Sequence, residues 1–355
     1  MNDYYITGIQ QVGIGVNDVY KAWEWYRKVL GFDIPIFDEK AEAALMLPYT
    51  DGKPQKRHAV LTYNLQGGGG LEIWQYTERT PQKPHFDVKL GDLGIFAIKI
   101  NTHAIDKLIK HLKRKQVEPS MIYNNHDYKT HFYFKDPYNN YIEAVENPYI
   151  FKNERKPNGG VAGVIIGVSD IDKSLPFYQN ILQYDQIVCD KQGIFYDFED
   201  LPGGQNMFRR VILTHSKPRV GAFSRQYGQT WIELVQVLDR EPKKIYQNRL
   251  WGDLGYIHIC FDVINSEKLK QVCHSAGHPF TVDSTEDSEI FQMDKATGRF
   301  GYVEDPDGTL IEFTEPFKIP VLKKLGIYID LRKRDPRKPL PNFLLKAMSL
   351  NRKKD

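Results

Sequence analysis

The segment GDLGYIHICF at residues 252–261 decides how the rest of the chain is interpreted. It begins with Gly-Asp-Leu-Gly and continues with the alternation that is typical of a β-strand. The segment GDLGIFAIKI at residues 91–100 repeats this pattern, with Ala97 at the position of His258. The chain therefore contains an internal repeat, and one copy carries an imidazole that the other lacks.

A second pair of segments extends the repeat. IQQVGIGVND at residues 9–18 and VAGVIIGVSD at residues 161–170 share one pattern, and a stretch with helical periodicity follows each of them. The chain is therefore predicted to contain four copies of one structural unit.

Each unit closes on a strand that contains a glutamate. In the second and fourth units this strand follows an Asp-Pro turn, which predicts a hairpin because Pro presets φ at the turn. Helical patterns at residues 105–115 and 266–276 precede these hairpins, so a unit comprises a strand, a helix and about three strands. The closing segments are LEIWQ at 71–75, FKDPYNNYIE at 134–143, IELVQ at 232–236 and VEDPDGTLIE at 303–312.

This fourfold arrangement resembles the vicinal oxygen chelate superfamily, which includes glyoxalase I, extradiol dioxygenases and bleomycin-resistance proteins. The resemblance spans residues 6–316. It implies an α+β fold in which four βαβββ modules pair into two cupped, barrel-like mixed sheets with helices outside. The expected halves are residues 1–150, with modules 1–80 and 81–150, and residues 158–316, with modules 158–242 and 243–316; a basic C-terminal extension follows at 317–355.

Four polar residues are predicted to lie on a concave sheet face. Side chains alternate between the two faces of a strand, so an apolar row marks the face that packs against helices. The polar positions left over are Gln11, Glu72, His258 and Glu312. The apolar rows that define them are Val12, Ile14 and Val16; Leu71 and Ile73; Ile257, Ile259 and Phe261; and Ile311 and Phe313.

Buried carboxylates and imidazoles are costly unless they are paired or bound to a cation. Two glutamates, one histidine and one glutamine oxygen suit a borderline divalent metal ion: Zn, Ni, Co, Mn or Fe. In the superfamily, each metal site takes a ligand from the first strand and a glutamate from the last strand of two modules. The resemblance places these positions at Gln11, Ala97, Gly163 and His258, and at Glu72, Glu143, Glu233 and Glu312.

The way the modules pair determines whether a site is complete. If neighbouring modules pair, each site lacks one of its four ligands. Ala97 occupies a ligand position in one site, and Gly163 occupies a ligand position in the other. If the first module pairs with the fourth, as in fused glyoxalases, Gln11, Glu72, His258 and Glu312 form one complete site. We prefer this second arrangement, because random loss would not be expected to leave the intact ligands in modules that can combine.

The ligand set is similar to that of zinc-type glyoxalase I. The resemblance implies a metal-dependent lyase or isomerase that acts on a small carbonyl or hydroxy-acyl substrate through a metal-stabilised enediolate. Glu312, with Glu72 opposite, is expected to move a proton between adjacent carbons. Glutathione is not favoured as a co-substrate, because Asn17 and Asp18 follow the first strand where the family has arginine.

Two other functions remain as alternatives. A non-heme Fe(II) ring-cleaving or ketoacid dioxygenase uses two histidines and one carboxylate, with the first histidine at the position of Gly163. A non-catalytic ligand-binding protein of the bleomycin-resistance kind requires no metal, and His258 then bonds to Glu312 or Glu233. Glu143 and Glu233 are interpreted as vestigial or bonded to polar neighbours. His126 and His131 are expected to be solvated, unless one lines the second cavity.

Composition places the chain among ordinary globular proteins, with 355 residues and 41% hydrophobic content. No apolar run is long enough to span a membrane and no secretory signal is present, so a cytoplasmic location is expected. The three cysteines fit no metal or disulfide pattern. Because the repeats already supply the pairing of modules, we expect a monomer or a homodimer.

The positive charge is concentrated in residues 317–355, which hold twelve Lys/Arg and three Asp/Glu. Such a segment can touch an anionic surface or nucleic acid. No nucleic-acid-reading motif is present, so we expect a solvated extension that lies on the more acidic body or on a second subunit. The expected partner is therefore a small-molecule substrate.

Overall fold

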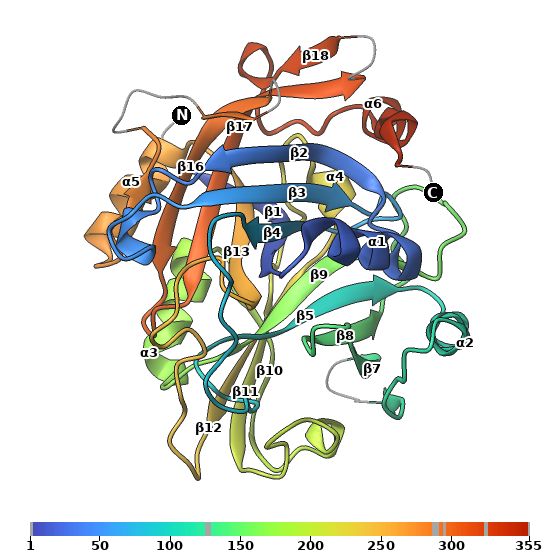
Figure 1. The fold of residues 1–355 in the computed structure, drawn as a ribbon, viewed down its shortest axis with the longest axis vertical. Coiled ribbons are helices and arrows are strands. Elements are labelled where there is room, and N and C mark those ends of the chain that lie inside the picture. Colours follow the sequence, from blue (N-terminus) through green and yellow to red (C-terminus); the bar gives the residue numbers. More distant parts are fainter. Residues whose placement is uncertain (1–2, 125–128, 286–290, 294–295, 323–325, 354–355) are drawn as a thin grey trace.

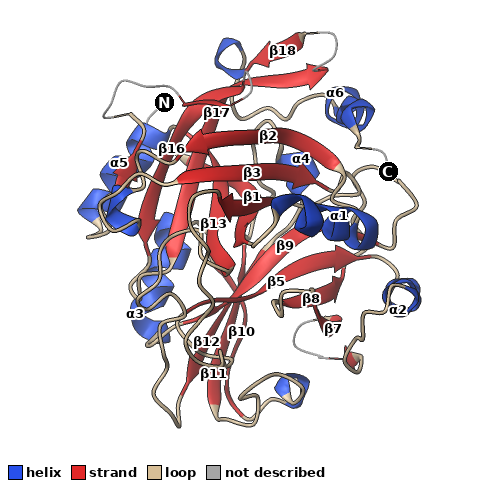
Figure 2. Cartoon of the chain, viewed as in Figure 1, coloured by secondary structure: helices blue, strands red, loops and turns tan. Residues whose placement is uncertain are grey.

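The computed structural model describes residues 3–124, 129–285, 291–293, 296–322 and 326–353. Two mixed sheets form the molecule, with helices on their outer faces (Figures 1 and 2). The larger sheet runs in the order β14-β16-β17-β13-β1-β4-β3-β2, and the smaller in the order β10-β11-β12-β9-β5-β8-β7-β6. The α+β fold and the two mixed sheets are thus confirmed.

The four modules follow one another along the chain. The first contains β1 (Tyr5–Gly15), α1 (Val19–Leu30), β2 (Ile34–Glu42), η1 (Leu47–Tyr49), β3 (Lys56–Tyr63) and β4 (Gly70–Tyr76). The second contains β5 (Gly94–Thr102), α2 (Ile105–Arg114), β6 (Tyr123–Asn124), β7 (Thr130–Lys135) and β8 (Tyr141–Glu146). The third contains β9 (Asn158–Gly167), α3 (Ile171–Pro176), η2 (Phe177–Ile181), β10 (Gln186–Gly193), η3 (Tyr196–Phe198), β11 (Phe208–Thr214), α4 (Ser224–Tyr227) and β12 (Trp231–Val237).

The fourth module contains β13 (Gly255–Ile264), α5 (Ser266–Ser275), β14 (Val282–Asp283), β15 (Phe291–Met293), β16 (Ala296–Glu304) and β17 (Leu310–Leu322). The chain then continues through β18 (Ile327–Asp330), η5 (Leu331–Lys333), α6 (Asn342–Ala347) and η6 (Met348–Asn351). The helices predicted at 105–115 and 266–276 and both Asp-Pro hairpins are present.

Local sequence signals explain the first helix. The Asp18 carboxylate accepts hydrogen bonds from the backbone N–H groups of Tyr20 and Lys21, which satisfies two donors at the start of α1. Gly31 ends the helix in the left-handed conformation, with φ of 71°. These caps fix the direction in which the chain leaves β1 and enters β2.

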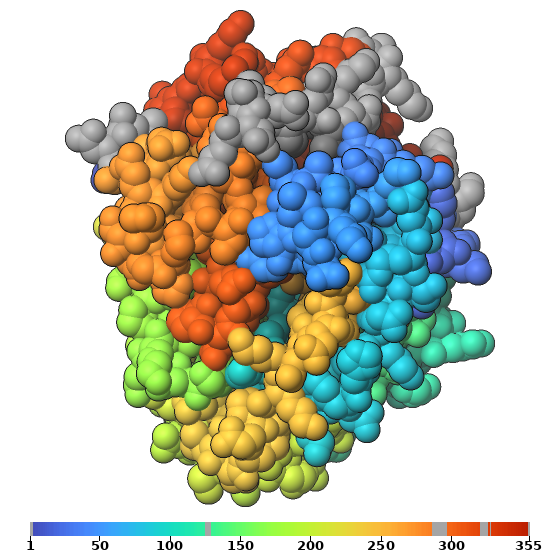
Figure 3. All heavy atoms as spheres, turned by 60° about the vertical axis from the view of Figure 1, so that its left-hand side comes forward, coloured from blue at the N-terminus to red at the C-terminus, as the bar shows by residue number. Residues whose placement is uncertain are grey.

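The first module pairs with the fourth. Strand β1 runs antiparallel to β13, with Gly13 opposite His258 and Gln11 opposite Cys260. Figure 3 shows the early chain, in blue, beside the orange segment of the fourth module. The second and third modules pair in the same way through β5 and β9. The preferred pairing is thus confirmed, and each half of the chain contributes one module to each sheet.

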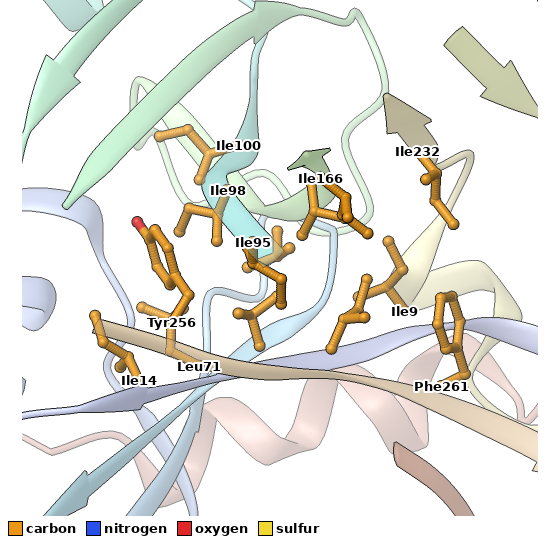
Figure 4. Packing of buried hydrophobic residues seen from close by; sticks show 14 of the residues in the cluster. Ile9, Ile14, Leu71, Ile95, Ile98, Ile100, Ile166, Ile232, Tyr256 and Phe261 are labelled. Carbon is orange, nitrogen blue, oxygen red and sulfur yellow. The ribbon is translucent and has the colours of Figure 1, made fainter. Parts of the chain in front are cut away.

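An apolar core fills the space between the two sheets. Figure 4 shows Ile9, Ile14 and Phe261 of one sheet pointing toward Ile98 and Ile166 of the other. The same cluster includes residues of α1, α2 and α5. The outer faces of both cups are therefore buried against helices and against each other.

One residue of the predicted apolar rows lies on the other face. Ile257 packs with Trp74 and Tyr302, whereas Tyr256 joins the core between the sheets. A bulge causes this, because the pairing shifts from Gly13 opposite His258 to Ile14 opposite Tyr256. The prediction for Ile257 was wrong, while His258 still lies on the concave side.

The C-terminal extension packs on the body of the protein. Its residues Leu331, Leu340, Leu345 and Met348 are buried in a cluster with Tyr227. In Figure 1 this segment lies across β2 and β17. The extension lies on the body as expected, but the expectation that it is solvated was wrong, because these apolar side chains are buried. Within the described chain, no helix combines the length and the apolar character needed to cross a membrane.

Candidate functional site

Four adjacent strands bring the predicted ligands together. In the sheet order β17-β13-β1-β4, each strand supplies one residue: Glu312, His258, Gln11 and Glu72. Parallel pairing places Glu72 beside Gly13 and Glu312 beside Cys260. Residues separated by up to 301 positions in the sequence therefore meet because the first and fourth modules share a sheet.

The polar atoms converge on one point. Nε2 of His258 lies 2.9 Å from Oε2 of Glu312 and 3.5 Å from Oε2 of Glu72. Nε2 of Gln11 lies 3.2 Å and 3.5 Å from the same oxygens of Glu72 and Glu312. One ligand atom each from Glu72, His258 and Glu312 lies within 4.8 Å of the others.

The site attracts positive charge. Burial alone would lower the pKa of His258, but the carboxylates of Glu312 and Glu72 outweigh it and raise this pKa to about 9. The His258 side chain is fully buried, and Glu72 and Glu312 are nearly so. Two carboxylates with so little access to water thus stabilise a cation between them, whether a proton on the imidazole or a metal ion.

Several atoms in the site lack a hydrogen-bond partner within the described structure. They are Oε1 of Gln11 and both ring nitrogens of His258. The oxygen of Glu312 is close to Nε2 of His258, but it lies off the direction in which a ring N–H would point. Rotation of the Gln11 amide would turn Oε1 toward the carboxylates. Four donors of the kind that a divalent ion requires then face one point, so the residues fit a metal ion.

Aromatic rings hold the imidazole in place. Trp251 stacks on His258 at 6.3 Å between ring centroids, and Tyr302 meets the ring edge-on at 5.5 Å. On the other side Gly13 leaves the space that the imidazole occupies, because a Cβ at this position would overlap the ring. His258 therefore has little freedom to leave its position.

A mostly apolar pocket opens over the carboxylates. Its volume is about 110 Å³, and its polar lining includes Gln11, Glu72 and Glu312 together with Gln10, Gln226, Thr297 and Thr314. Aromatic and aliphatic side chains from four parts of the chain form its walls: Phe37 and Leu61, Phe223 and Tyr227, Phe300, and Ile319 and Met348. A small molecule in this pocket would lie directly against the site.

The second sheet has replaced the equivalent site with an ion-pair cluster. The ammonium group of Lys99 contacts Oε2 of Glu143 and lies 2.6 Å from Oε2 of Glu233. Arg210 lies 2.6 Å from both Glu233 and Asp197. Although burial raises it, the pKa of Glu233 is held below its usual range by Arg210 and Lys99. The chain thus supplies its own cations at this position, and the prediction that Glu143 and Glu233 bond to polar neighbours is confirmed.

His131 belongs to the same cluster. Its Nε2 lies 3.3 Å from Asp197 and 3.9 Å from Glu143, and its side chain is fully buried. The expectation of a solvated His131 was therefore wrong, because its side chain is buried among the charged groups of the second sheet. His126 lies outside the described residues.

The sequence contained a signal for Lys99 that the prediction missed. In residues 91–100 the apolar row includes Ile98 and Ile100, so alternation places Lys99 on the concave side with Ala97. Strand alternation gives no such signal for Asp197, because it lies in the short helix η3.

Comparison with known proteins identifies the fold. The family model "Glyoxalase/Bleomycin resistance protein/Dioxygenase superfamily" matches residues 8–144 and 160–313. No curated protein sequence matches the chain.

Among solved structures, a putative dioxygenase from Bacillus subtilis has a TM-score of 0.56 at 14% identity, with 88% of this chain and 86% of that chain covered. Glyoxalase I from Zea mays has a TM-score of 0.51 at 12% identity, with 98% and 96% covered. Likeness at these identities shows the fold alone. The family match on both halves, together with four modules paired into two cupped sheets, shows that the chain belongs to the glyoxalase/bleomycin resistance/dioxygenase superfamily.

Proposed function

We propose that Gln11, Glu72, His258 and Glu312 hold one divalent metal ion, and that the protein is a metal-dependent lyase or isomerase of the glyoxalase type. One observation carries the proposal: ligand atoms of two carboxylates and one imidazole lie within 4.8 Å of one another beneath an apolar pocket. The substrate is a small carbonyl or hydroxy-acyl compound.

The donor set supports this choice of chemistry. One imidazole and two carboxylates, completed by an amide oxygen, suit Zn, Ni, Co, Mn or Fe. When bound, such an ion would polarise two neighbouring substrate oxygens and acidify the adjacent C–H bond. The apolar walls of the pocket exclude water, which strengthens electrostatic interactions within it.

The protein's own residues would carry the proton. Oε2 of Glu312 and Oε2 of Glu72 both lie close to Nε2 of Gln11. All three residues line the pocket. One carboxylate removes the proton from a substrate carbon, and the same or the opposite carboxylate returns it to the adjacent carbon. His258 and Gln11 keep their positions during this transfer, because Trp251 and the strand pairing fix them.

The two alternatives differ from this proposal in their requirements. A dioxygenase of the two-histidine, one-carboxylate type needs a second imidazole, and the described site offers one imidazole with two carboxylates. A non-catalytic binding protein needs only the apolar pocket. The donor atoms without hydrogen-bond partners favour a metal over an empty pocket.

Proton exchange with solvent tests the proposal directly. The metal-loaded protein is incubated in D₂O with a panel of small α-hydroxy-carbonyl compounds, and deuterium at the substrate carbons is followed by NMR. We expect incorporation with the wild type and loss of incorporation with Glu312→Gln and Glu72→Gln. Oxygen uptake with an Fe(II)-loaded sample in place of proton exchange would support the dioxygenase instead.

A further inference from the structure

The C-terminal extension forms part of the pocket wall. Met348 of η6 and Ile319 of β17 line the pocket that also contains Gln11, Glu72 and Glu312. Met348 is 6% exposed, whereas Leu350, two residues further along the same short helix, is 66% exposed. The contrast shows that Met348 is directed into the protein rather than toward solvent.

The same apolar cluster holds the extension and the pocket together. Leu340 and Leu345 are buried in one apolar cluster with Tyr63 and Tyr227, and both tyrosines line the pocket. The backbone N–H of Leu340 donates a 2.9 Å hydrogen bond to the carbonyl of Ala222, next to the α4 segment. The extension that carries Met348 is thus packed against residues that line the pocket.

An ion-pair network fixes the end of the extension. The guanidinium of Arg352 contacts both Asp33 and Glu154, which come from the start of β2 and from the segment between the halves. Lys156 lies 2.9 Å from Asp33 and 3.0 Å from Glu154 and completes the network. The backbone N–H of Lys353 also donates to the carbonyl of Asp33, at 3.0 Å. Four residues after Met348, the chain is therefore anchored at a defined point.

The walls of the pocket offer no cationic side chain to a substrate. Among the described residues that line it, the only charged side chains are the carboxylates of Glu72 and Glu312, which the proposed metal ion would balance. An anionic group on the substrate beyond the metal-binding oxygens would therefore be buried without a cationic side chain beside it. The apolar walls instead favour a hydrocarbon or aromatic group.

We propose that the C-terminal extension completes the substrate pocket, and that Met348 limits the length of an uncharged apolar group attached to the vicinal oxygens of the substrate. This inference rests on the proposed metal site. A cavity of about 110 Å³ is somewhat smaller than the roughly 150 Å³ cavity that holds benzene in an engineered protein, so the wall at Met348 restricts the substrate to a short group.

Alkyl hydroxamates test this inference because a hydroxamate binds a metal ion through two neighbouring oxygens and carries a tail of chosen length. The full-length protein is loaded with Co(II), and acetohydroxamate, butyrohydroxamate and octanohydroxamate are titrated while the visible absorption of Co(II) is recorded. In the wild type we expect affinity to rise about threefold to fourfold for each added methylene, and then to fall once the tail reaches Met348.

Substitutions at Met348 should move this limit in opposite directions. Met348→Ala should increase the affinity for octanohydroxamate at least about tenfold, because the removed side chain makes room for several methylenes, and should leave the affinity for acetohydroxamate unchanged. Met348→Phe should lower the affinity for butyrohydroxamate. Leu350→Ala is the matched control and should not change the profile. Arg352→Gln should weaken the discrimination between tail lengths, whereas Arg337→Gln, an exposed arginine of the same extension, should not.

A charged tail provides an independent test. A six-carbon hydroxamate that ends in a carboxylate should bind at least about tenfold more weakly than hexanohydroxamate, because the hydroxamate occupies the metal ion and the pocket walls offer no cationic side chain to the terminal carboxylate.

The outcomes separate the two proposals. If Co(II) binds and acetohydroxamate changes its spectrum, but neither Met348 substitution alters the tail profile, the extension does not limit the substrate and the metal proposal stands. If the charged and uncharged tails bind equally, the assignment of an uncharged group is wrong. If Co(II) does not bind the wild type, both proposals fail.

Discussion

Gly13 faces His258 across the antiparallel pairing of β1 with β13, and its missing side chain provides the space that the imidazole fills. A Cβ at Gly13 would overlap the ring, which Trp251 holds from another side. The geometry of the site therefore depends on a glycine that offers no ligand of its own.

Gly13→Ala should displace His258 and weaken metal binding by roughly tenfold or more, as a misplaced supporting group does in metal sites. The crowding should also destabilise the fold by about 1–3 kcal/mol. Competition with a colorimetric chelator measures the affinity, and urea unfolding measures the stability. Gly52→Ala is the control for metal affinity, because no atom lies within 4 Å of a Cβ there; its φ of 68° makes the substitution cost stability through backbone strain, so it is no control for the unfolding measurement. Unchanged metal affinity in Gly13→Ala would show that the imidazole is not held as described.

Lys99→Met tests the ion-pair cluster of the second sheet. The substitution leaves Glu143 and Glu233 facing each other with less positive charge, and removal of one partner from a buried ion pair costs about 3–5 kcal/mol. We expect a loss of this size in urea unfolding, with metal content at the first sheet unaffected. Lys110→Met, at an exposed position of α2, should change stability little. Equal stability of the two variants would contradict a structural role for Lys99.

Asp262 is expected to make stability depend on pH. Burial raises the pKa of this carboxyl to about 7, with the nearby charge of Glu315 adding to the effect and the Thr7 hydroxyl opposing it. Between the unfolded pKa of 3.8 and about 7 the folded state binds more protons, so stability falls as pH rises through this range.

Asp262→Asn should remove that fall and be more stable than the wild type at pH 8, by a few kcal/mol as an order of magnitude. Below pH 4 the two proteins should have similar stability, because the wild-type carboxyl is then protonated in both states. Urea unfolding at several pH values measures this difference. Asp51→Asn, at an exposed position, is the control. The difference in stability between the wild type and Asp262→Asn should therefore move against the wild type from pH 5 to pH 8. If this difference instead moves in favour of the wild type, the sign of the pKa shift is wrong.

The fold and most of the candidate site could be predicted because strand alternation is a local property. It placed Gln11, Glu72, His258 and Glu312 on the concave side, and the survival of these four residues in the first and fourth modules indicated the pairing. The bulge at Ile257 could not be predicted, since it depends on the register between two strands 240 residues or more apart in sequence. The position of Met348 could not be predicted either, because the basic composition of the extension conceals its few buried apolar contacts.

The central claim is that His258 binds a metal ion, and the metal content of purified protein tests it most directly. Wild type, His258→Ala, Gln11→Ala and the control His103→Ala are each equilibrated with Zn, Ni, Co, Mn and Fe, desalted and analysed by elemental mass spectrometry. We predict about one ion per chain for the wild type and His103→Ala, a reduced content for Gln11→Ala, and almost none for His258→Ala. Full metal content in both His258→Ala and Gln11→Ala would show that the ion, and therefore the chemistry, lies elsewhere.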